Sequence, residues 1–471
     1  MKKYFFITSL AFIVLNGCKK IETTPAPQVD LINSTDQIND TDQIKTSAVN
    51  NARKFYIDPS STASLSNGSF TNPFKSITQV NAIVLYAGDS VFFKNGQVFS
   101  GALNIKYSGT ITDPIVYTNY GSGLIPVFNN AFSNVVNFNT VKYVVLNGIK
   151  ITDYTMNPSD RSIPANVKYA INLNNSTNCT ISNMDISLVG VGISVGNGSN
   201  GNRITRNNIS NLRMIRNTPT TINANDDYGA NPMVIQSSNN MIDNNYFKDC
   251  WATSYDYGFD GGAVELYGTN ISNNKIIYNT AIDCNGFVEV GSATNGTADG
   301  NVVAYNKIIN CGSAGTFQTS GTFAVKISRF QYYNNNFIET VKQFAKPSNL
   351  FYSSLRTPPT GMLILRNNIF WLSSGVNAYP TYLNNASVIH SNNIYRMAYG
   401  VAGITLNNSE LYSKTLNIFT TISGSPIAWN YALLPTTPAV NFGVHSNVGL
   451  TKDFHGKSIV GNPDAGILEL Q

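Results

Sequence analysis

Three similar short segments of the sequence each carry one charged residue between aliphatic residues. The charged residues are Glu265, Glu289 and Lys326, in the segments 263–266 (Ala-Val-Glu-Leu), 287–290 (Phe-Val-Glu-Val) and 324–327 (Ala-Val-Lys-Ile). Two carboxylates held close together share a proton, bind a cation, or are compensated by a neighbouring lysine. Such a pair can serve as acid and nucleophile in a hydrolysis, or as ligands of a calcium ion.

The pattern of these segments indicates β-strands. Because side chains alternate between the two faces of a strand, we expect the aliphatic residues inward and the charged residues outward. In stacked parallel strands about 4.8 Å apart, the three charged residues form one outward column, and Ile235 holds the same position one turn earlier. The alternative is a solvated surface column closed by an ordinary ion pair.

Long insertions precede the charged segments, at residues 217–232, 250–262 and 311–322. Insertions in a solenoid gather on one side and often carry the binding site. The second insertion contains Trp251, Tyr255 and Tyr257 and ends near Asp260. Aromatic rings stack on the apolar faces of sugars, so we predict that these three residues bind substrate. The alternative is a loop folded onto itself around Trp251.

Further side chains complete the candidate site. Arg206 and Arg329 are predicted to bind acidic groups of a sugar, because guanidinium groups pair well with carboxylates and sulfates. Asp260 is predicted to join the two glutamates and Lys326 as a catalytic residue. No histidine precedes His390 in the sequence, which argues against a histidine-based mechanism in this zone.

Asparagine repeats indicate the element that positions these residues. A unit of polar residue, Asn-Asn and apolar residue recurs every 25 to 37 residues or so, at 205–209, 242–246, 271–274, 304–306, 333–337, 365–369 and 391–394. Asn tolerates left-handed backbone and can hydrogen-bond along a stack, so we interpret these residues as scaffold. The repeat predicts an all-β, single-stranded right-handed parallel β-helix with long loops on one side.

Composition narrows the possible partners. Charged residues make up 12% of the 471 residues, about half the usual share, and the formal net charge is only +5. This charge is too small and scattered to predict nucleic-acid binding. We expect a polysaccharide partner and a monomeric protein.

Four cysteines lie in the predicted solenoid, at positions 179, 250, 284 and 311. Cys250, Cys284 and Cys311 recur at about 30-residue intervals in equivalent contexts. We therefore expect a column of buried free thiols, with disulfides as the alternative open to an exported protein. No Cys-x-x-Cys or Cys/His spacing predicts zinc.

Several segments resemble a known group of proteins. Residues 55–59 (Phe-Tyr-Ile-Asp-Pro), 72–74, 87–91, 120–123 and 462–469 are similar to segments of secreted bacterial β-helix proteins of the pectate-lyase-like superfamily. The resemblance covers nearly all of residues 53 to 471 and implies the fold. It assigns no catalytic residue, because the superfamily contains lyases, hydrolases, epimerases and binding proteins.

The N-terminus predicts export. A basic start and an apolar stretch from Tyr4 to Leu15 are typical of a secretory signal peptide, and residues 15–18 (Leu-Asn-Gly-Cys) resemble the bacterial lipobox. That resemblance implies acylation of Cys18 and a lipid anchor in the outer membrane, on a side that the sequence leaves open. The predicted regions are a signal peptide (1–17), a flexible tether (18–50), an N-terminal cap with first coils (51–130), the β-helix with its site loops (131–400), and final coils with a C-terminal cap (401–471).

Three functions fit the sequence. The first is cleavage of an acidic polysaccharide by β-elimination, with Ca²⁺ on Glu265, Glu289 and Asp260, and Lys326 or Tyr257 as base. In that mechanism Arg329 or a tyrosine assists the leaving oxygen. The second is hydrolysis of a glycosidic bond by two carboxylates. The third is glycan binding or adhesion without catalysis.

Overall fold

The computed structural model describes residues 52–129, 133–293, 295–341 and 349–470. The predicted signal peptide, Cys18 and the tether lie outside the described residues. The longest described helix, α1 (Ile77–Ala82), has six residues. No helix in the described part of the chain has the length and apolar character needed to cross a membrane.

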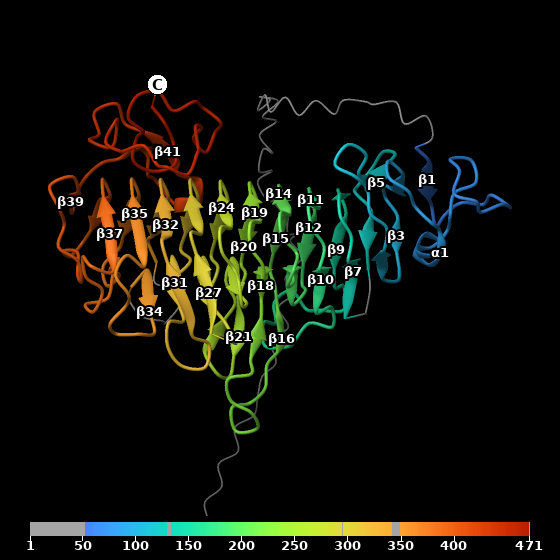
Figure 1. Cartoon of the computed structure of the whole chain (residues 1–471), viewed down its shortest axis with the longest axis horizontal. Helices are drawn as coiled ribbons and strands as arrows, with labels where there is room; N and C mark the ends of the chain where they lie inside the picture. The colour runs from blue at the N-terminus through green and yellow to red at the C-terminus, as the bar shows by residue number, and fades with distance from the viewer. Residues whose placement is uncertain (1–51, 130–132, 294, 342–348, 471) are drawn as a thin grey trace, which may run out of the picture. The chain divides into compact units, whose positions relative to one another are not determined.

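Three long parallel sheets of 12, 9 and 12 strands run along the described chain, and a typical central coil contributes one strand to each sheet (Figure 1). A typical coil consists of β23 (Val264–Tyr267), β24 (Lys275–Ile277) and β25 (Thr280–Ile282), and the next coil begins with β26 (Val288–Gly291). Every one of these strands pairs in parallel with the equivalent strand of the following coil. The described residues therefore form a parallel β-helix, and the predicted all-β solenoid is confirmed.

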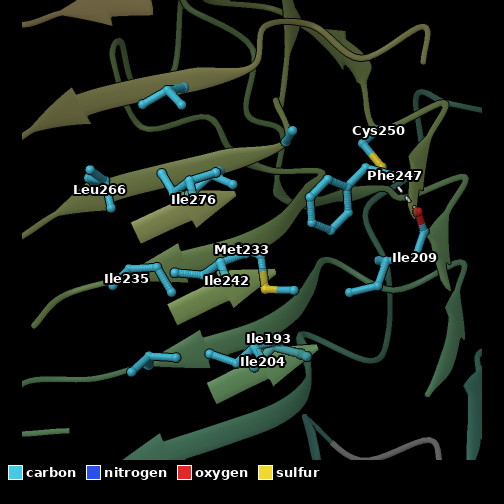
Figure 2. Packing of buried hydrophobic residues seen from close by; sticks show 14 of the residues in the cluster. Ile193, Ile204, Ile209, Met233, Ile235, Ile242, Phe247, Cys250, Leu266 and Ile276 are labelled. Atoms are coloured by element: carbon cyan, nitrogen blue, oxygen red, sulfur yellow. Dashed lines mark hydrogen bonds between the residues drawn. The ribbon is translucent and has the colours of Figure 1, made fainter. Parts of the chain in front are cut away.

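Aliphatic residues fill the interior in continuous rows. Ile204 of β14 (Arg203–Thr205) lies opposite Ile242 of β19 (Met241–Asp243), and Ile276 of β24 follows in the same register. Ile235 of β18 (Asn231–Ile235) lies opposite Leu266 in the same way. All five are completely buried, and Figure 2 shows them packed in layers across the core. Burial of each such side chain stabilises the fold by about 1.5–3 kcal/mol.

Asparagine side chains form a ladder at the turn between the first large sheet, which contains β24, and the third, which contains β25. Asn279 Nδ2 donates to Asn306 Oδ1 (3.0 Å), and Asn279 Oδ1 accepts from Asn245 Nδ2 (3.0 Å). The ladder runs through Asn207, Asn245, Asn279, Asn306, Asn335, Asn368 and Asn393. Each residue is at most 2% exposed, so these bonds replace hydration that the turn would otherwise lose. The predicted scaffold role of the Asn repeat is confirmed.

Most coils use their Asn residues in two different ways. The residue before the ladder Asn adopts the left-handed conformation, and in most coils it is also Asn, as at Asn244 (φ 55°) and Asn367 (φ 60°). The second residue of such a pair enters the ladder. This division exploits both properties of Asn, its tolerance of positive φ and its capacity to donate and accept at once.

The predicted spacing of the repeat is wrong at one coil. The segment 271–274 does not align with 242–246, because Asn274 belongs to a second ladder that links Asn202, Asn240, Asn274 and Asn301. The true partner of Asn245 is Asn279, 34 residues later, and Asn306 follows after 27 residues. Each of these coils carries two ladder positions with similar local sequence, so the repeat predicted from the sequence combined residues of two different ladders.

The cysteine prediction is confirmed. Cys179, Cys250, Cys284 and Cys311 are free and buried. Cys250, Cys284 and Cys311 contact one another in successive coils, and burial raises the pKa of the Cys250 and Cys311 thiols. They therefore act as small core residues at the turn after the third sheet.

The ends of the solenoid are covered differently. Helix α1 buries Ile77 and Val80 against the first coils. At the other end, the last strand of the third sheet is β39 (Leu411–Ser413). The residues that follow pack along the side of the coils: Asn334 Nδ2 donates to Asp464 O, and Tyr278 Oη donates to Lys452 O.

We predict that Asn279→Ala lowers the free energy of unfolding by about 2–3 kcal/mol, because it leaves buried donors and acceptors without partners. Asn239→Gly is the matched control, since Asn239 is exposed with φ 61° and makes no ladder bond. Glycine adopts that conformation readily, so we expect a change within about 0.5 kcal/mol. Urea unfolding followed by circular dichroism measures both. Equal destabilisation by the two variants would contradict the role of the ladder.

Candidate active site

Glu265 and Glu289 lie directly opposite each other on neighbouring strands. The pairing of β23 with β26 puts Glu265 in register with Glu289. Their flanking residues Val264, Leu266 and Val288 are buried in the core, so both glutamates point outward and are partly buried. The predicted stacking of the two carboxylates is confirmed, whereas their chemical role stays a prediction.

The predicted column is wrong for Lys326 and Ile235. After Glu289 the register continues to Thr316 of β30 (Gly315–Phe317). Lys326 belongs to β31 (Val325–Ser328), which pairs with β27 (Gly296–Asp299) outside the three large sheets. β27 and β31 are extra strands of their coils, and β31 has the same alternation of aliphatic and charged residues as the glutamate strands, which misled the alignment.

Ile235 is displaced by one residue from its predicted place. Val234, and not Ile235, lies opposite Glu265, while Ile235 pairs with Leu266 and faces the core. A shift of one residue moves a side chain to the other face of a strand. Glu265 is therefore the first charged residue of the column.

A cavity of about 890 Å³ opens over the two glutamates. The hairpin of β16 (Met214–Arg216) and β17 (Tyr228–Gly229) supplies Asp226, Asp227 and Tyr228. The hairpin of β21 (Ala252–Ser254) and β22 (Gly258–Asp260) supplies Tyr257 and Asp260. Residues of the third insertion, among them Gln318, complete the lining. All three predicted insertions thus contribute to one site.

Glu265 lies in surroundings that favour its neutral form. Burial raises the pKa of the Glu265 carboxyl well above its usual range, and the nearby Glu289 and Asp260 raise it further. Asn231 opposes this effect, because its Nδ2 donates to Glu265 Oε2 at 2.8 Å. Desolvation disfavours the ionised form and a neighbouring anion adds to that cost. Glu265 is therefore suited to donate a proton at neutral pH.

Glu289 is held by a different partner. Gln318 Nε2 donates to Glu289 Oε1 at 3.2 Å. This bond fixes one oxygen of the carboxylate. Asp260, at the end of β22, accepts from Gly261 N at 2.8 Å. The hairpin β21–β22 thereby brings Asp260 close enough to act on the pKa of Glu265.

Tyrosine rings make up much of the wall. Burial and the nearby acids, first Asp260, raise the pKa of Tyr257 to about 12. Tyr257 is thus a hydrogen-bond donor rather than a base at neutral pH. Tyr267 follows Glu265 on the same strand and lies 6.2 Å from the ring of Phe323, centroid to centroid.

Four predicted binding residues do not line the cavity. Trp251 packs between Arg161 (4.1 Å to the ring centroid) and Phe259 (5.5 Å between centroids), so the alternative of a loop folded around Trp251 is correct. Tyr255 is 60% exposed at the tip of its hairpin, outside the cavity. Insertion loops must bury part of their own apolar surface, and Trp251 serves that purpose.

The two predicted arginines also lie elsewhere. Arg206 is exposed at a turn with φ 55°. Arg329 lies at a different turn, just before β32 (Phe330–Tyr333), and pairs with both oxygens of Asp299. Sequence proximity to the charged segments suggested these residues, but the turns place them away from the face that carries Glu265 and Glu289.

Sequence reasoning missed several lining residues, including Asn231, Gln318, Tyr169 and Tyr352. Tyr352 of β34 (Phe351–Ser353) follows Thr316 in the register of the glutamates. An alignment of the strands continued toward the C-terminus, from Glu289 through Thr316, could have identified Tyr352. Asn231 and Gln318 are identified only by their contacts with the carboxylates.

The cavity has a strongly acidic lining. Its carboxylates are Asp226, Asp227, Asp260, Glu265 and Glu289. In the part of the chain that the structure describes, no Lys, Arg or His lines it. Glu265, Glu289 and Asp260 have the oxygen atoms that calcium prefers, and each glutamate also accepts from an amide.

A second acidic group forms part of the wall. One carboxylate oxygen each of Asp226, Asp227 and Asp256 lie within 4.8 Å of one another. Asp227 accepts from Thr218 N, Ser254 Oγ and Asp256 N, while Asp256 accepts from the backbone of Asp226 and Asp227. These bonds join the two hairpins and explain the cluster as a structural clamp.

Comparison with known proteins supports the fold. The family model described as a right handed beta helix region matches residues 169–353. The crystal structure of pectate lyase Pel9A is 14% identical over 90% of this chain and 98% of its own, with a TM-score of 0.52. A GH136 lacto-N-biosidase from Eubacterium ramulus is 13% identical over 77% of this chain and 67% of its own (TM-score 0.42).

An alginate lyase from Paenibacillus sp. is 14% identical over 77% of this chain and 99% of its own (TM-score 0.40). No curated protein matches the sequence. The family model and the likeness to the pectate lyase structure show that the protein has a right-handed parallel β-helix fold, the fold that the sequence resemblance implied.

We predict that Glu265→Gln makes stability less dependent on pH. The raised pKa of Glu265 means that the folded state favours its protonated form, so this contribution is complete below the unfolded pKa and is lost as pH rises through the folded pKa. Glutamine is neutral at every pH, so the variant does not lose this contribution to stability as pH rises. Thermal melts from pH 5 to 9 should show the variant gaining Tm relative to the unaltered protein as pH rises. A constant difference over this range would contradict the assignment.

Proposed function

We propose that the protein is a glycoside hydrolase that acts on a glycan without charged groups at the cleavage point. The observation that carries the proposal is the pair Glu265 and Glu289, which lie in register on adjacent strands at the base of a large cavity. Glu265 is held in surroundings that strongly favour its protonated form. Two carboxyl groups in different environments are the arrangement that glycoside hydrolysis requires.

Each glutamate has a definite role in this mechanism. Glu265 donates its proton to the glycosidic oxygen as the bond to the anomeric carbon breaks, and Glu289 attacks that carbon from the opposite side. The Glu265 carboxylate then removes a proton from water, which hydrolyses the glycosyl ester on Glu289. Neighbouring strands lie about 4.8 Å apart, close to the separation of about 5–5.5 Å that retaining enzymes use.

The surrounding residues support the same reaction. Asn231 and Gln318 orient one carboxylate each, and Asp260 contributes to the high pKa of the acid. The rings of Tyr267 and Phe323 offer an apolar surface for a sugar ring, and Tyr257 offers a hydroxyl donor.

The charge of the cavity favours an uncharged substrate. Besides the protonated Glu265, four acidic side chains line it, and no described basic residue offsets them, so a uronic acid would be repelled. The predicted elimination depended on Lys326 as base and Arg329 at the leaving group, and neither lines the cavity. Elimination would instead need a cation such as Ca²⁺ between Glu265 and Glu289 to neutralise the sugar carboxylate.

We predict that Glu289→Gln and Glu265→Gln each lower kcat by about 10²–10⁴-fold, because each removes a group that acts in the transition state. Asp185→Asn is the matched control: Asp185 lies on another sheet, in an exposed ion pair with Lys150. Reducing-end assays on neutral glycans measure the rates, and melting curves check folding. Full activity in both glutamine variants would remove the proposed site.

We predict that the products carry new reducing ends and lack the ultraviolet absorbance of an unsaturated sugar. The rate should also remain unchanged in EDTA, since the two glutamates act without a metal. Assays on neutral glycans, polygalacturonate and alginate, with and without EDTA and Ca²⁺, make the comparison. Calcium-dependent formation of unsaturated products would replace hydrolysis with elimination at the same pair. Binding without any turnover would identify a glycan-binding protein.

A further inference from the structure

We infer that the first coils carry a second glycan-binding surface, separate from the acidic cavity and made of one exposed and three partly exposed aromatic rings. The first large sheet begins with β1 (Lys54–Ile57), β2 (Ser90–Lys94) and β5 (Ile115–Tyr120), which lie at the N-terminal end of the described chain (Figure 1). A cavity of about 700 Å³ lies on their outer face. The inference does not rest on the proposed hydrolysis.

Four aromatic rings form the surface. Tyr56 lies in register with Phe92 on the neighbouring strand, and the two rings stack at 5.2 Å with an interplanar angle of 17°. Phe70 and Tyr120 each meet the Tyr56 ring edge to face, at 5.1 and 5.2 Å. The group, which we call the aromatic platform, consists of Tyr56, Phe70, Phe92 and Tyr120.

The platform remains exposed because its loop is fixed in place. Phe70 is 66% exposed, although it lies in a loop that is tied to β1 at both ends. Tyr56 N donates to Gly68 O, and Phe74 N donates to Tyr56 O, both at 2.8 Å. The loop therefore holds Phe70 against Tyr56 and cannot turn it inward. A large apolar ring held in water in this way is typical of a binding surface.

Polar groups around the platform suit a sugar. The cavity is lined by Asp58 and Lys94, by the exposed Lys54 at its edge, and by the hydroxyl groups of Ser61, Thr71 and Ser122. Lys94 Nζ and Asp58 Oδ2 are 2.6 Å apart, so the two charges compensate each other. Rings for the apolar face of a sugar, with hydroxyls and a neutralised ion pair for its hydroxyl groups, favour an uncharged polysaccharide chain over an anionic one.

The platform and the acidic cavity occupy different sheets. The platform lies on the outer face of β1, β2 and β5, whereas the glutamates lie on β23 and β26 of the second large sheet. A chain bound at the platform therefore leaves the acidic cavity accessible. This arrangement would keep the protein on an insoluble or surface-bound polymer between encounters at the other site.

Affinity electrophoresis of the full chain tests the inference. Glu289→Gln serves as the background, so that turnover does not consume the polymer. Gels that contain soluble xylan, galactomannan or laminarin should retard the protein in at least one case. Phe70→Ala should weaken that binding about tenfold, the effect of one lost ring contact. Ile111→Ala and Tyr399→Ala are matched controls, because these residues are 80% and 58% exposed outside the platform.

Several results would overturn the inference. One is that none of the three polymers retards the protein. Another is that Phe70→Ala leaves binding unchanged. A further contradictory result is that the protein binds only polygalacturonate, and that this binding is lost both in salt and in Lys54→Ala. Such binding would indicate charge attraction. A Phe70→Ala protein that changes from dimer to monomer in light scattering would identify a second copy as the occupant. Since binding is measured without turnover, failure of the proposed hydrolysis leaves this test intact.

Discussion

The parallel register between successive coils is the constraint on which this structure depends. Two buried Asn ladders maintain it, and each rung donates to the next coil and accepts from the preceding one. A slip of one residue would orphan these buried groups and also turn the aliphatic rows outward. The ladder ends at Glu410, whose Oε1 accepts from Asn393 Nδ2, so the last rung also has a partner. The exact register is therefore the low-energy arrangement of the whole solenoid.

Register also creates the chemistry of the candidate site. A carboxylate on one strand lies about 4.8 Å from its counterpart on the next, a distance that loops seldom hold with such precision. Glu265 and Glu289 are partly buried beneath two hairpins, which removes water from one side of the pair. Desolvation and mutual repulsion then raise the pKa of Glu265. Asn231 and Gln318 limit that repulsion by donating to one glutamate each.

The coils vary in length without disturbing the core, because turns between strands tolerate insertions where ladder residues do not. The insertions at 217–232 and 250–262 form hairpins that join through Asp227 and Asp256 and stand over the second sheet. In the first coils, an insertion at a turn forms a short loop in which the side chain of Phe70 is exposed. Both surfaces are additions to a scaffold whose inward face is uniform.

The sequence alone determined the all-β solenoid, the scaffold role of Asn, the free thiols and the pairing of Glu265 with Glu289, because these follow from local periodicity repeated coil after coil. The tertiary structure decided the rest. Lys326 lies between two aliphatic residues, as Glu289 does, but it belongs to an added strand. Only the hydrogen-bond pairing of the strands distinguishes the two positions. Trp251 is packed within its own loop, since the way an insertion folds depends on contacts with Arg161, about 90 residues away in the chain. Periodicity specifies which face a residue takes, whereas long-range packing specifies which residues share a cavity.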